Sequence, residues 1–442
     1  MASRADAAPP SPPLADDGVL GETGPIVVAL AALSLALTAA TAPERAAHLP
    51  LGPATLHEQR TTKQVTDGVE WTRVTRRGRG GPFRVDVLAV DRSRPGGTIG
   101  VLSGHDRVPG LERVSAMARR HRAVAGINGG YFAVGAPDVG DPTGLVVDDG
   151  AILSEPVGAR TAFLVPQSAT EPVRVAALRW DGSLIAGGAS RLVDGVNRNR
   201  GRIPACGGVG GDRPTQNIDP ARTCTDASEL VVLTPPFGAS TRTGRGGYEA
   251  VVRDDVVASV RRTANSAIPR DGYVLSGSGS AGRFLRDHLA PGDMPDLELG
   301  LRDGGTTRSA GDYAAIVGGA PRLVRRGHVH VSARREGRAG DTGRNPRSIA
   351  GVRADGTVLF ITIDGRRPGW SLGATLHEAA ATARALGATD AVNLDSGGST
   401  TMTVRKRVVN RPSDLRGERR VANGLFVLRP APTRRSPRGP RP

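Results

Sequence analysis

Residues 357–402 read TVLFITIDGRRPGWSLGATLHEAAATARALGATDAVNLDSGGSTTM, and this stretch decides the fold of the C-terminal part of the chain. The run 357–363 is almost continuously apolar, as a strand buried on both faces requires. Residues 375–388 place apolar side chains on one face of a helix, and residues 390–395 form a second strand-like run. The stretch therefore predicts a strand–helix–strand unit.

The predicted helix carries its own boundary signals. Thr375 followed by Glu378 is a capping-box pattern, and Gly387 suits the left-handed residue that ends many helices. If the two strands are parallel, the connection between them is almost always right-handed. Asp364 and Asp395 would then stand at the same carboxyl edge of the sheet, where open sheets bind ligands.

The residues after Asp395 combine small size with hydrogen-bonding groups. The turn offers backbone N–H groups without bulk, together with hydroxyls, from Gly397, Gly398, Ser399 and Thr400. Such a concave turn binds phosphate well, although an ordinary glycine-rich turn is the alternative. Two carboxylates at one edge suit hydrolysis of a glycosidic bond, whereas Asp364 could equally be a turn residue that caps a backbone N–H.

Two further polar residues lie in short motifs. Arg347, in NPRSIAG (345–351), has a guanidinium that can grip a phosphate in two places. A surface arginine is a strong alternative in a chain so rich in this residue. Asn128, in GINGGYF (126–132), can donate to a sugar hydroxyl or merely favour the turn.

The rest of the chain favours strands joined by tight turns. There are 60 glycines and only 3% aromatic residues. Residues 141–154 predict a hairpin with Asp149 and Gly150 at its tip, and residues 111–123 have helical spacing. We expect an α+β fold of mixed sheets, with one βαβ unit near the C-terminus, several hairpins and few long helices.

The expected organisation has four parts. Residues 1–42 read as a signal peptide or a membrane anchor, because residues 25–42 are apolar and end in an A-x-A-like site. Residues 43–67 read as a linker, and residues 68–428 as one catalytic domain. Residues 429–442 are expected to form a disordered basic tail. The chain is therefore expected to be secreted or held in the cell envelope, with membrane contact only through an uncleaved N-terminal segment.

The charge and the cysteines limit the partners. The net charge is +16, but the arginines are scattered, and no aromatic-plus-basic motif indicates nucleic acid. Phosphorylated or acidic glycans are better partners for such a surface. Cys206 and Cys224 are expected to pair after export, with two free thiols as the alternative. No cofactor is indicated and a metal site is unknown, although scattered carboxylates could bind Ca²⁺ or Mg²⁺.

An ordered set of motifs resembles the phosphodiester glycosidase family. The set covers residues 71–428 and comprises GINGGYF, DPTGLVV, IVGGAPRLV, NPRSIAGV, TIDGR with SLGATLHEAA, AVNLDSGGSTTM and NRPSDLRGERRVANGLFVL. The family usually has a third glycine where Ser396 stands. If that position needs a positive φ, serine would cost roughly 1 kcal/mol.

The resemblance implies cleavage of the sugar–oxygen bond of a sugar-1-phosphodiester, which releases free sugar and a phosphomonoester. In this hypothesis Asp395 is the nucleophile or base and Asp364 is a supporting residue or the acid. Arg347 and the Ser399/Thr400 turn hold the phosphate. The sugar is oriented by Asn128 and Asn393, and the second-rank candidates for the rim of the site are Asp414 and Glu418.

Two other functions fit the same residues. A phosphodiesterase would use the same cleft but cleave the P–O bond. A non-catalytic envelope module would bind anionic glycans without turning them over.

Overall fold

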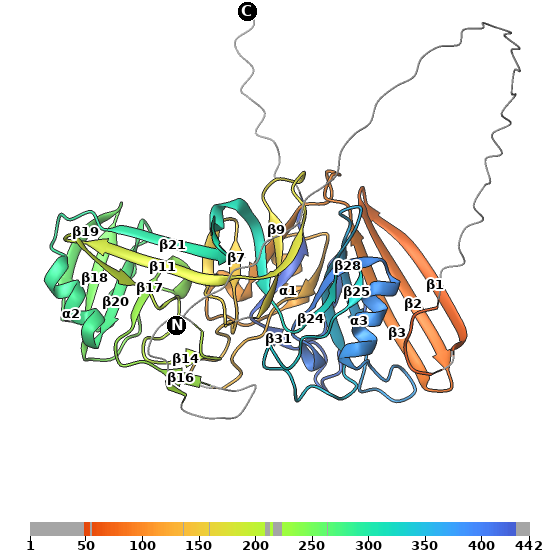
Figure 1. Ribbon diagram of the computed structural model, residues 1–442. Helices are drawn as coiled ribbons and strands as arrows, with labels where there is room; N and C mark the ends of the chain where they lie inside the picture. The colour runs from red at the N-terminus through yellow and green to blue at the C-terminus, as the bar shows by residue number, and fades with distance from the viewer. Residues whose placement is uncertain are drawn as a thin grey trace, which may run out of the picture. The chain divides into compact units, whose positions relative to one another are not determined.

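The computed structural model describes residues 48–429, except residues 54, 136, 159, 208–212, 215–222 and 263 (Figure 1). The expected signal peptide or anchor (1–42), the start of the expected linker and nearly all of the expected basic tail lie outside the described residues. Among the described residues, no helix combines the length and the hydropathy needed to cross a membrane.

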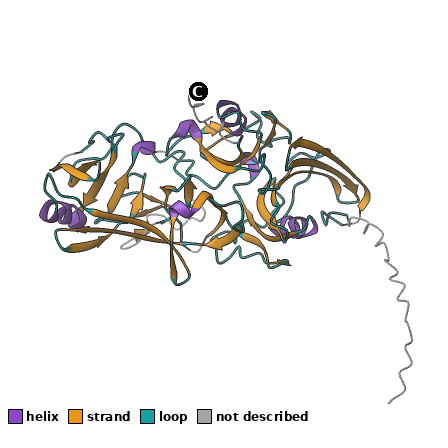
Figure 2. Ribbon diagram, turned by 90° about the horizontal axis from the view of Figure 1, so that it is seen from above, coloured by secondary structure: helices purple, strands orange, loops and turns teal. Residues whose placement is uncertain are grey.

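The described chain is mostly β-structure with three α-helices, which confirms the predicted fold class (Figure 2). The helices are α1 (Val114–Arg120), α2 (Gly279–His288) and α3 (Leu376–Ala385). None exceeds 10 residues.

An eight-stranded sheet contains the predicted strand–helix–strand unit. Its strands, in spatial order, are β1 (Thr55–Thr66), β2 (Val69–Gly78), β3 (Gly81–Val90), β27 (Val358–Ile363), β26 (Arg347–Arg353), β28 (Ala388–Asn393), β24 (Arg322–Arg325) and β25 (His328–Val329). β26 lies between β27 and β28 and is antiparallel to both. β27 and β28 therefore run in the same direction without touching, and their carboxyl ends lie at one edge of the sheet.

β1 corrects the expected linker. Residues 55–66, placed in the linker 43–67 from the sequence, form a 12-residue strand paired with β2. Most of its side chains are exposed on both faces of an edge strand. The segment therefore lacks the apolar alternation by which a half-buried strand is recognised in a sequence. Pairing with β2 alone holds it in the sheet.

The two faces of the eight-stranded sheet belong to different cores. In β27, Val358 and Phe360 face one core, while Leu359, Ile361 and Ile363 face the other, as the two-residue period of a strand requires. α3 packs its apolar face on the second core. The capping box of Thr375 and Glu378 forms as predicted.

Two five-stranded sheets share the first core. One has the order β30 (Arg407–Val408), β29 (Met402–Val404), β6 (Ala125–Asn128), β32 (Asn423–Val427) and β4 (Ile99–Ser103). The other has the order β10 (Arg174–Ala177), β9 (Thr161–Pro166), β23 (Tyr313–Gly318), β7 (Val146–Asp148) and β8 (Ala151–Ser154). β7 and β8 form the predicted hairpin around Asp149 and Gly150. Phe163 of β9 packs edge-on against Phe360 of β27, with ring centroids 6.2 Å apart.

Residues 178–312, which we call the insert, lie between β10 and β23. They contain α2 and two larger sheets. One sheet consists of β11 (Arg179–Ala186), β12 (Ala189–Leu192), β21 (Asp296–Asp303) and β22 (Thr306–Ser309). The other consists of β13 (Gly195–Val196), β17 (Leu230–Leu233), β18 (Gly247–Arg253), β19 (Val256–Arg261) and β20 (Gly272–Ser278).

Smaller elements complete the insert and its surroundings. Three short strands of the insert are β14 (Ile203–Pro204), β15 (Arg213–Pro214) and β16 (Thr223–Thr225). The disulfide between Cys206 and Cys224 joins this region, as the sequence predicted. Outside the insert, β5 (Glu112–Arg113) pairs with β31 (Arg420–Val421).

Candidate functional site

The candidate site lies at the edge where β27 and β28 end. Asp364 follows β27 directly, and Asp395 follows β28 after Leu394. Arg347 begins β26 at the same edge, because it pairs with Ile363. Strands two places apart in a sheet are separated by roughly 10 Å, so one cleft-sized region can include both carboxylates.

Asp395 is half-buried, and its backbone is fixed on both sides. Its N–H donates to Gly129 O (3.0 Å), and its carbonyl accepts from Asn128 Nδ2 (2.7 Å). The carboxylate accepts from the N–H of Ser396 (2.9 Å). The strand end therefore presents a carboxylate of fixed orientation that still reaches solvent.

Burial raises the pKa of Asp395 to about 6. The hydroxyl of Ser399 and the N–H of Ser396 act in the opposite direction. The guanidiniums of Arg419 and Arg338 also act to lower this pKa. Asp395 thus titrates near neutral pH beside two positive charges.

The two glycines after Asp395 lack side chains because charged side chains pack directly against the backbone of this turn. A Cβ at Gly398 would lie 2.0 Å from Asp414 Oδ1 and 2.2 Å from Arg419 Nη2. Gly397 has φ +67°, and a Cβ there would lie 3.2 Å from Arg366 Nη2. The two glycines of the opening motif therefore allow charged side chains to approach the backbone closely, which only residues without a Cβ permit.

Ser396 is not strained. Its φ is −126°, which is extended backbone, so the expected cost of serine at this position does not arise. Its hydroxyl bonds to Asn393 Oδ1 (3.1 Å) and Leu394 O (3.0 Å). The N–H of Gly397 donates to Pro346 O (3.0 Å), so this donor is already used inside the protein.

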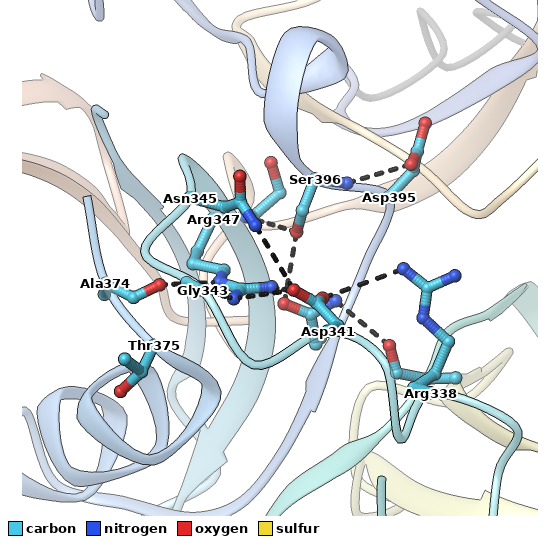
Figure 3. A network of polar contacts seen from close by, with 12 residues as sticks. Arg338, Asp341, Gly343, Asn345, Arg347, Ala374, Thr375, Asp395 and Ser396 are labelled. Atoms are coloured by element: carbon cyan, nitrogen blue, oxygen red, sulfur yellow. Dashed lines mark hydrogen bonds and ion pairs between the residues drawn. The ribbon is translucent and has the colours of Figure 1, made fainter. Parts of the chain in front are cut away.

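Arg347 lies beneath the site. Its side chain is fully buried, donates to Ala374 O (2.9 Å) and forms an ion pair with Asp341 (2.5 Å). Asp341 also faces Arg338 at 3.7 Å. Figure 3 shows the Asp341 carboxylate between the guanidiniums of Arg338 and Arg347. Arg347 therefore fixes Asp341, which in turn holds Arg338.

The contacts from Arg347 through Asp341 hold the guanidinium of Arg338 near Asp395. It stacks over the ring of Tyr131, with its Cζ 4.4 Å from the ring centroid. Its Nε is buried and has no hydrogen-bond partner among the described residues. Burial raises the pKa of Tyr131 to about 12, so the phenol stays neutral and acts as a flat support for the cation.

Asn128 and Asn393 are brought to the site but are fully buried. Asn128 Oδ1 accepts from Ser348 Oγ (2.7 Å) and Thr401 N (3.1 Å). Asn393 Nδ2 donates to Tyr131 Oη (2.8 Å) and to the carbonyls of Ala320 and Leu394. Both amides therefore hold the Asp395 turn from inside.

Asp364 holds the loop of residues 410–419, which we call the rim loop. Its carboxylate accepts from Trp370 Nε1 (2.8 Å), Asn410 Nδ2 (3.0 Å) and the N–H of Arg411 (3.0 Å). Only 2% of Asp364 is exposed. Burial raises its pKa, while the bonds from Trp370 and Asn410 act to lower it. This geometry matches the turn-and-cap alternative seen in the sequence.

The rim loop supplies the second group of charges. Asp414 and Arg419 form a bidentate pair with N–O distances of 2.8 and 3.0 Å, and this pair lies on Gly398. Glu418 instead accepts from the N–H (2.7 Å) and hydroxyl (2.6 Å) of Ser115 in the first turn of α1. Asp414 thus reaches the site, whereas Glu418 anchors the loop to a helix.

Several side chains at the site were missed by sequence reasoning. Asn423 is 1% exposed, accepts from Gly130 N (3.0 Å), and its Nδ2 has no partner among the described residues. The hydroxyl of Thr401 was also missed. Like that of Thr400, which the sequence had suggested as a phosphate ligand, it is buried and unpartnered there. Among so many arginines, nothing in the sequence marked Arg338 or Arg419. The motif RVANG was the only signal for Asn423.

The described residues contain no group of three or more His, Cys, Asp or Glu side chains that could hold a metal ion. His328 lies in the exposed strand β25, and His330 follows this strand. The site is therefore built from one titrating carboxylate, several guanidiniums and unpartnered polar groups.

Residues 246–428 match the family model described as phosphodiester glycosidase. The resemblance seen in the sequence is thereby confirmed. There is no significant match among curated proteins.

Solved structures are similar over most of the chain. One, described as a "Putative exported protein" from Burkholderia pseudomallei, has 27% identity and a TM-score of 0.76, and the match covers 86% of this chain and 98% of that one. A hypothetical protein from Synechocystis has 22% identity and a TM-score of 0.64, over 85% of this chain and 64% of that one. This second similarity shows the fold alone.

A third structure is the zebrafish N-acetylglucosamine-1-phosphodiester alpha-N-acetylglucosaminidase catalytic domain, auto-inhibited by its pro-peptide. It has 14% identity and a TM-score of 0.38, over 84% of this chain and 88% of that chain. At this TM-score the similarity supports no inference about this chain.

Proposed function

We propose that this protein is an exported hydrolase that cleaves the glycosidic C–O bond of a sugar-1-phosphodiester. The observation that carries the proposal is Asp395, a half-buried carboxylate with a pKa of about 6, beside the guanidiniums of Arg338 and Arg419. The family match over residues 246–428 supports the reaction class. The disulfide and the similarity to a protein described as exported support the location.

The proposed reaction matches the charges at the site. When the bond between the anomeric carbon and the phosphate oxygen breaks, the electron pair leaves with the phosphomonoester. A phosphomonoester has a second pKa of about 6, so it departs without a strong general acid. Arg338 and Arg419 stabilise the charge on the departing phosphate, together with Arg366 beside Gly397.

Asp395 stabilises the positive charge that develops at the anomeric carbon, as nucleophile or as base toward the incoming water. The oxygen of that water ends in the free sugar. The Nδ2 of Asn423 and the hydroxyls of Thr400 and Thr401 are buried and have no hydrogen-bond partner among the described residues, so we assign them no direct contact with the substrate. The turn after Asp395 and the charged groups around it are held in position by the buried residues Asp364, Arg347, Asn128 and Asn393.

The test is incubation with methyl diesters of several sugar 1-phosphates in ¹⁸O-labelled water, with and without a chelator. We expect free reducing sugar that carries the label, together with methyl phosphate. Label in the phosphate product would mean a phosphodiesterase. Binding of the diesters without turnover would leave the envelope glycan-binding module as the function. Loss of turnover with the chelator would add a Ca²⁺ or Mg²⁺ requirement.

A further inference from the structure

A hollow of about 470 Å³ opens on the insert, on elements that carry no residue of the candidate site. It is lined by Arg245, Gly246, Arg262 and Ala264. The first two residues lead into β18, and the last two follow β19. The hollow thus lies between two loops at one end of this hairpin pair.

The hollow carries unbalanced positive charge. Arg242 and Arg261 flank its two lining arginines in the sequence, and all four of these side chains are exposed. None of them forms an ion pair among the described residues. A fifth guanidinium, that of Arg200, donates to Gly244 O (3.5 Å) and Ser276 Oγ (2.9 Å), and burial lowers its pKa.

A carboxylate of β18 that contacts both loops is already engaged. Glu249 is 1% exposed and accepts from Thr243 Oγ1 (2.6 Å), Ser266 N (3.1 Å) and Ser276 Oγ (3.1 Å). It therefore ties both loops to β20, and the four exposed guanidiniums have no ion-pair partner among the described residues, although that of Arg242 stacks over the ring of Phe237 with its Cζ 5.3 Å from the ring centroid.

The walls of the hollow are built into the fold. Thr241 N donates to Ser266 O (2.9 Å), and Arg242 N donates to Asn265 Oδ1 (3.2 Å). Asn265 N returns a bond to Thr243 Oγ1 (3.0 Å). Because the two loops are joined at three places, the arginines are presented by a braced surface, which reduces the ordering cost of binding.

We propose that this hollow is a second binding site, for a phosphate-bearing glycan chain. Guanidinium forks suit the paired oxygens of phosphate, and the volume lies in the range of small-ligand sites, roughly 300–1,000 Å³. No aromatic side chain lines the hollow, so nucleic-acid bases would have nothing to stack on. Its lining offers no large apolar side chain to a lipid. A second contact would hold a polymeric substrate near the enzyme.

The test measures binding of a phosphodiester-linked oligosaccharide by calorimetry at low salt. Every protein carries Asp395→Asn, so that turnover does not consume the probe. We expect Arg245→Gln/Arg262→Gln to weaken binding roughly tenfold and to reduce its salt dependence. Arg179→Gln/Arg308→Gln, which removes two exposed arginines from the other large sheet of the insert, is the matched control and should bind as the parent does.

Unchanged affinity in the Arg245→Gln/Arg262→Gln protein would overturn the proposal. It would also be overturned if a single-stranded oligonucleotide bound more tightly than the glycan and lost its affinity in the same variant. A dephosphorylated oligosaccharide should not bind. Because the assay needs no hydrolysis, its result is independent of whether the proposed reaction is correct.

Discussion

Asp395 shows how one residue gains its chemistry from its surroundings. The raised pKa comes from burial at the end of β28, and nearby guanidiniums oppose it without cancelling it. The same burial requires the glycines that follow, because Asp414, Arg419 and Arg366 pack against a backbone without side chains. The charge and the two small residues of the opening motif are thus parts of one arrangement.

The pH dependence of the reaction should report the titration of Asp395. Since the proposed role needs the carboxylate, kcat/KM should rise with pH through an apparent pKa of about 6. Arg338→Gln should move this limb to higher pH and lower kcat/KM, because a cation that favours the charged form is lost. The measurement is kcat/KM as a function of pH. Arg325→Gln is the control, since Arg325 is exposed on β24 toward the opposite end of β28. An unshifted limb in Arg338→Gln would contradict the assignment.

Gly398→Ala should abolish most turnover without unfolding the protein. The new Cβ would lie 2.0 Å from Asp414 Oδ1, so the Asp414–Arg419 pair must move away from the turn. We expect kcat/KM to fall by about 100-fold, which corresponds to about 2.7 kcal/mol. Gly305→Ala is the control, because no atom lies within 4 Å of a Cβ there. Full activity of Gly398→Ala would show that this close contact is dispensable.

At the scale of elements, β26 and the rim loop assemble the site. β26 separates β27 from β28 and brings Arg347 to the edge where both strands end. Asn410 connects Asp364 with the turn, since its Nδ2 also donates to Thr400 O (3.1 Å). Asp364 itself lies about two strand spacings from Asp395. It therefore acts on the site through the rim loop, which carries Arg419.

Asp364→Asn should separate positioning from catalysis. The variant should lower the melting temperature and raise KM, because the rim loop loses charge-assisted bonds worth roughly 1.5–3 kcal/mol each. The acid limb of kcat/KM should stay near pH 6, because Asp395 sets it. Steady-state kinetics over pH, with thermal melts, provide the check. If a limb of the profile vanished while KM stayed unchanged, Asp364 would be the catalytic acid.

At the scale of the whole molecule, buried carboxyl groups recur in both the insert and the rest of the fold. Burial raises the pKa of Asp86 to about 6, of Asp148 to about 6 and of Asp194 to about 7, from an ordinary value of 3.8. The folded protein binds protons at these groups more strongly than the unfolded chain does. They therefore oppose folding increasingly as the pH rises from about 4 to about 7.

Asp194→Asn tests this linkage. The amide keeps an acceptor for the N–H of Leu230, now 2.6 Å from the carboxylate, but removes the buried charge. The variant should be more stable than the parent at about pH 8 and should lose this advantage at about pH 4. Thermal melts across this range give the result, with the exposed Asp255→Asn as control. A difference in stability that does not change with pH would be inconsistent with this account.

Local patterns were sufficient for much of the fold. The capping box at Thr375 and Glu378, the apolar run of β27 and the tip at Asp149 are short-range features, and each formed where the sequence indicated. The sequence left open whether the two strands are parallel, and pairing of both with β26 gives β27 and β28 the same direction. β1 escaped detection because its pairing, rather than its composition, makes it a strand.

The sequence by itself determined the strand–helix–strand unit and the stretch in which a carboxylate precedes a small-residue turn, since these depend on residues close together in the chain. It also favoured the disulfide, with free thiols as the alternative. Only the tertiary structure decided which of the many arginines reach that turn. Arg347 is buried against Asp341, whereas Arg338 and Arg419 face Asp395 from loops distant in sequence. The pKa of Asp395 depends on the same contacts, because burial and charge proximity are set by packing between segments and not by the order of residues along the chain.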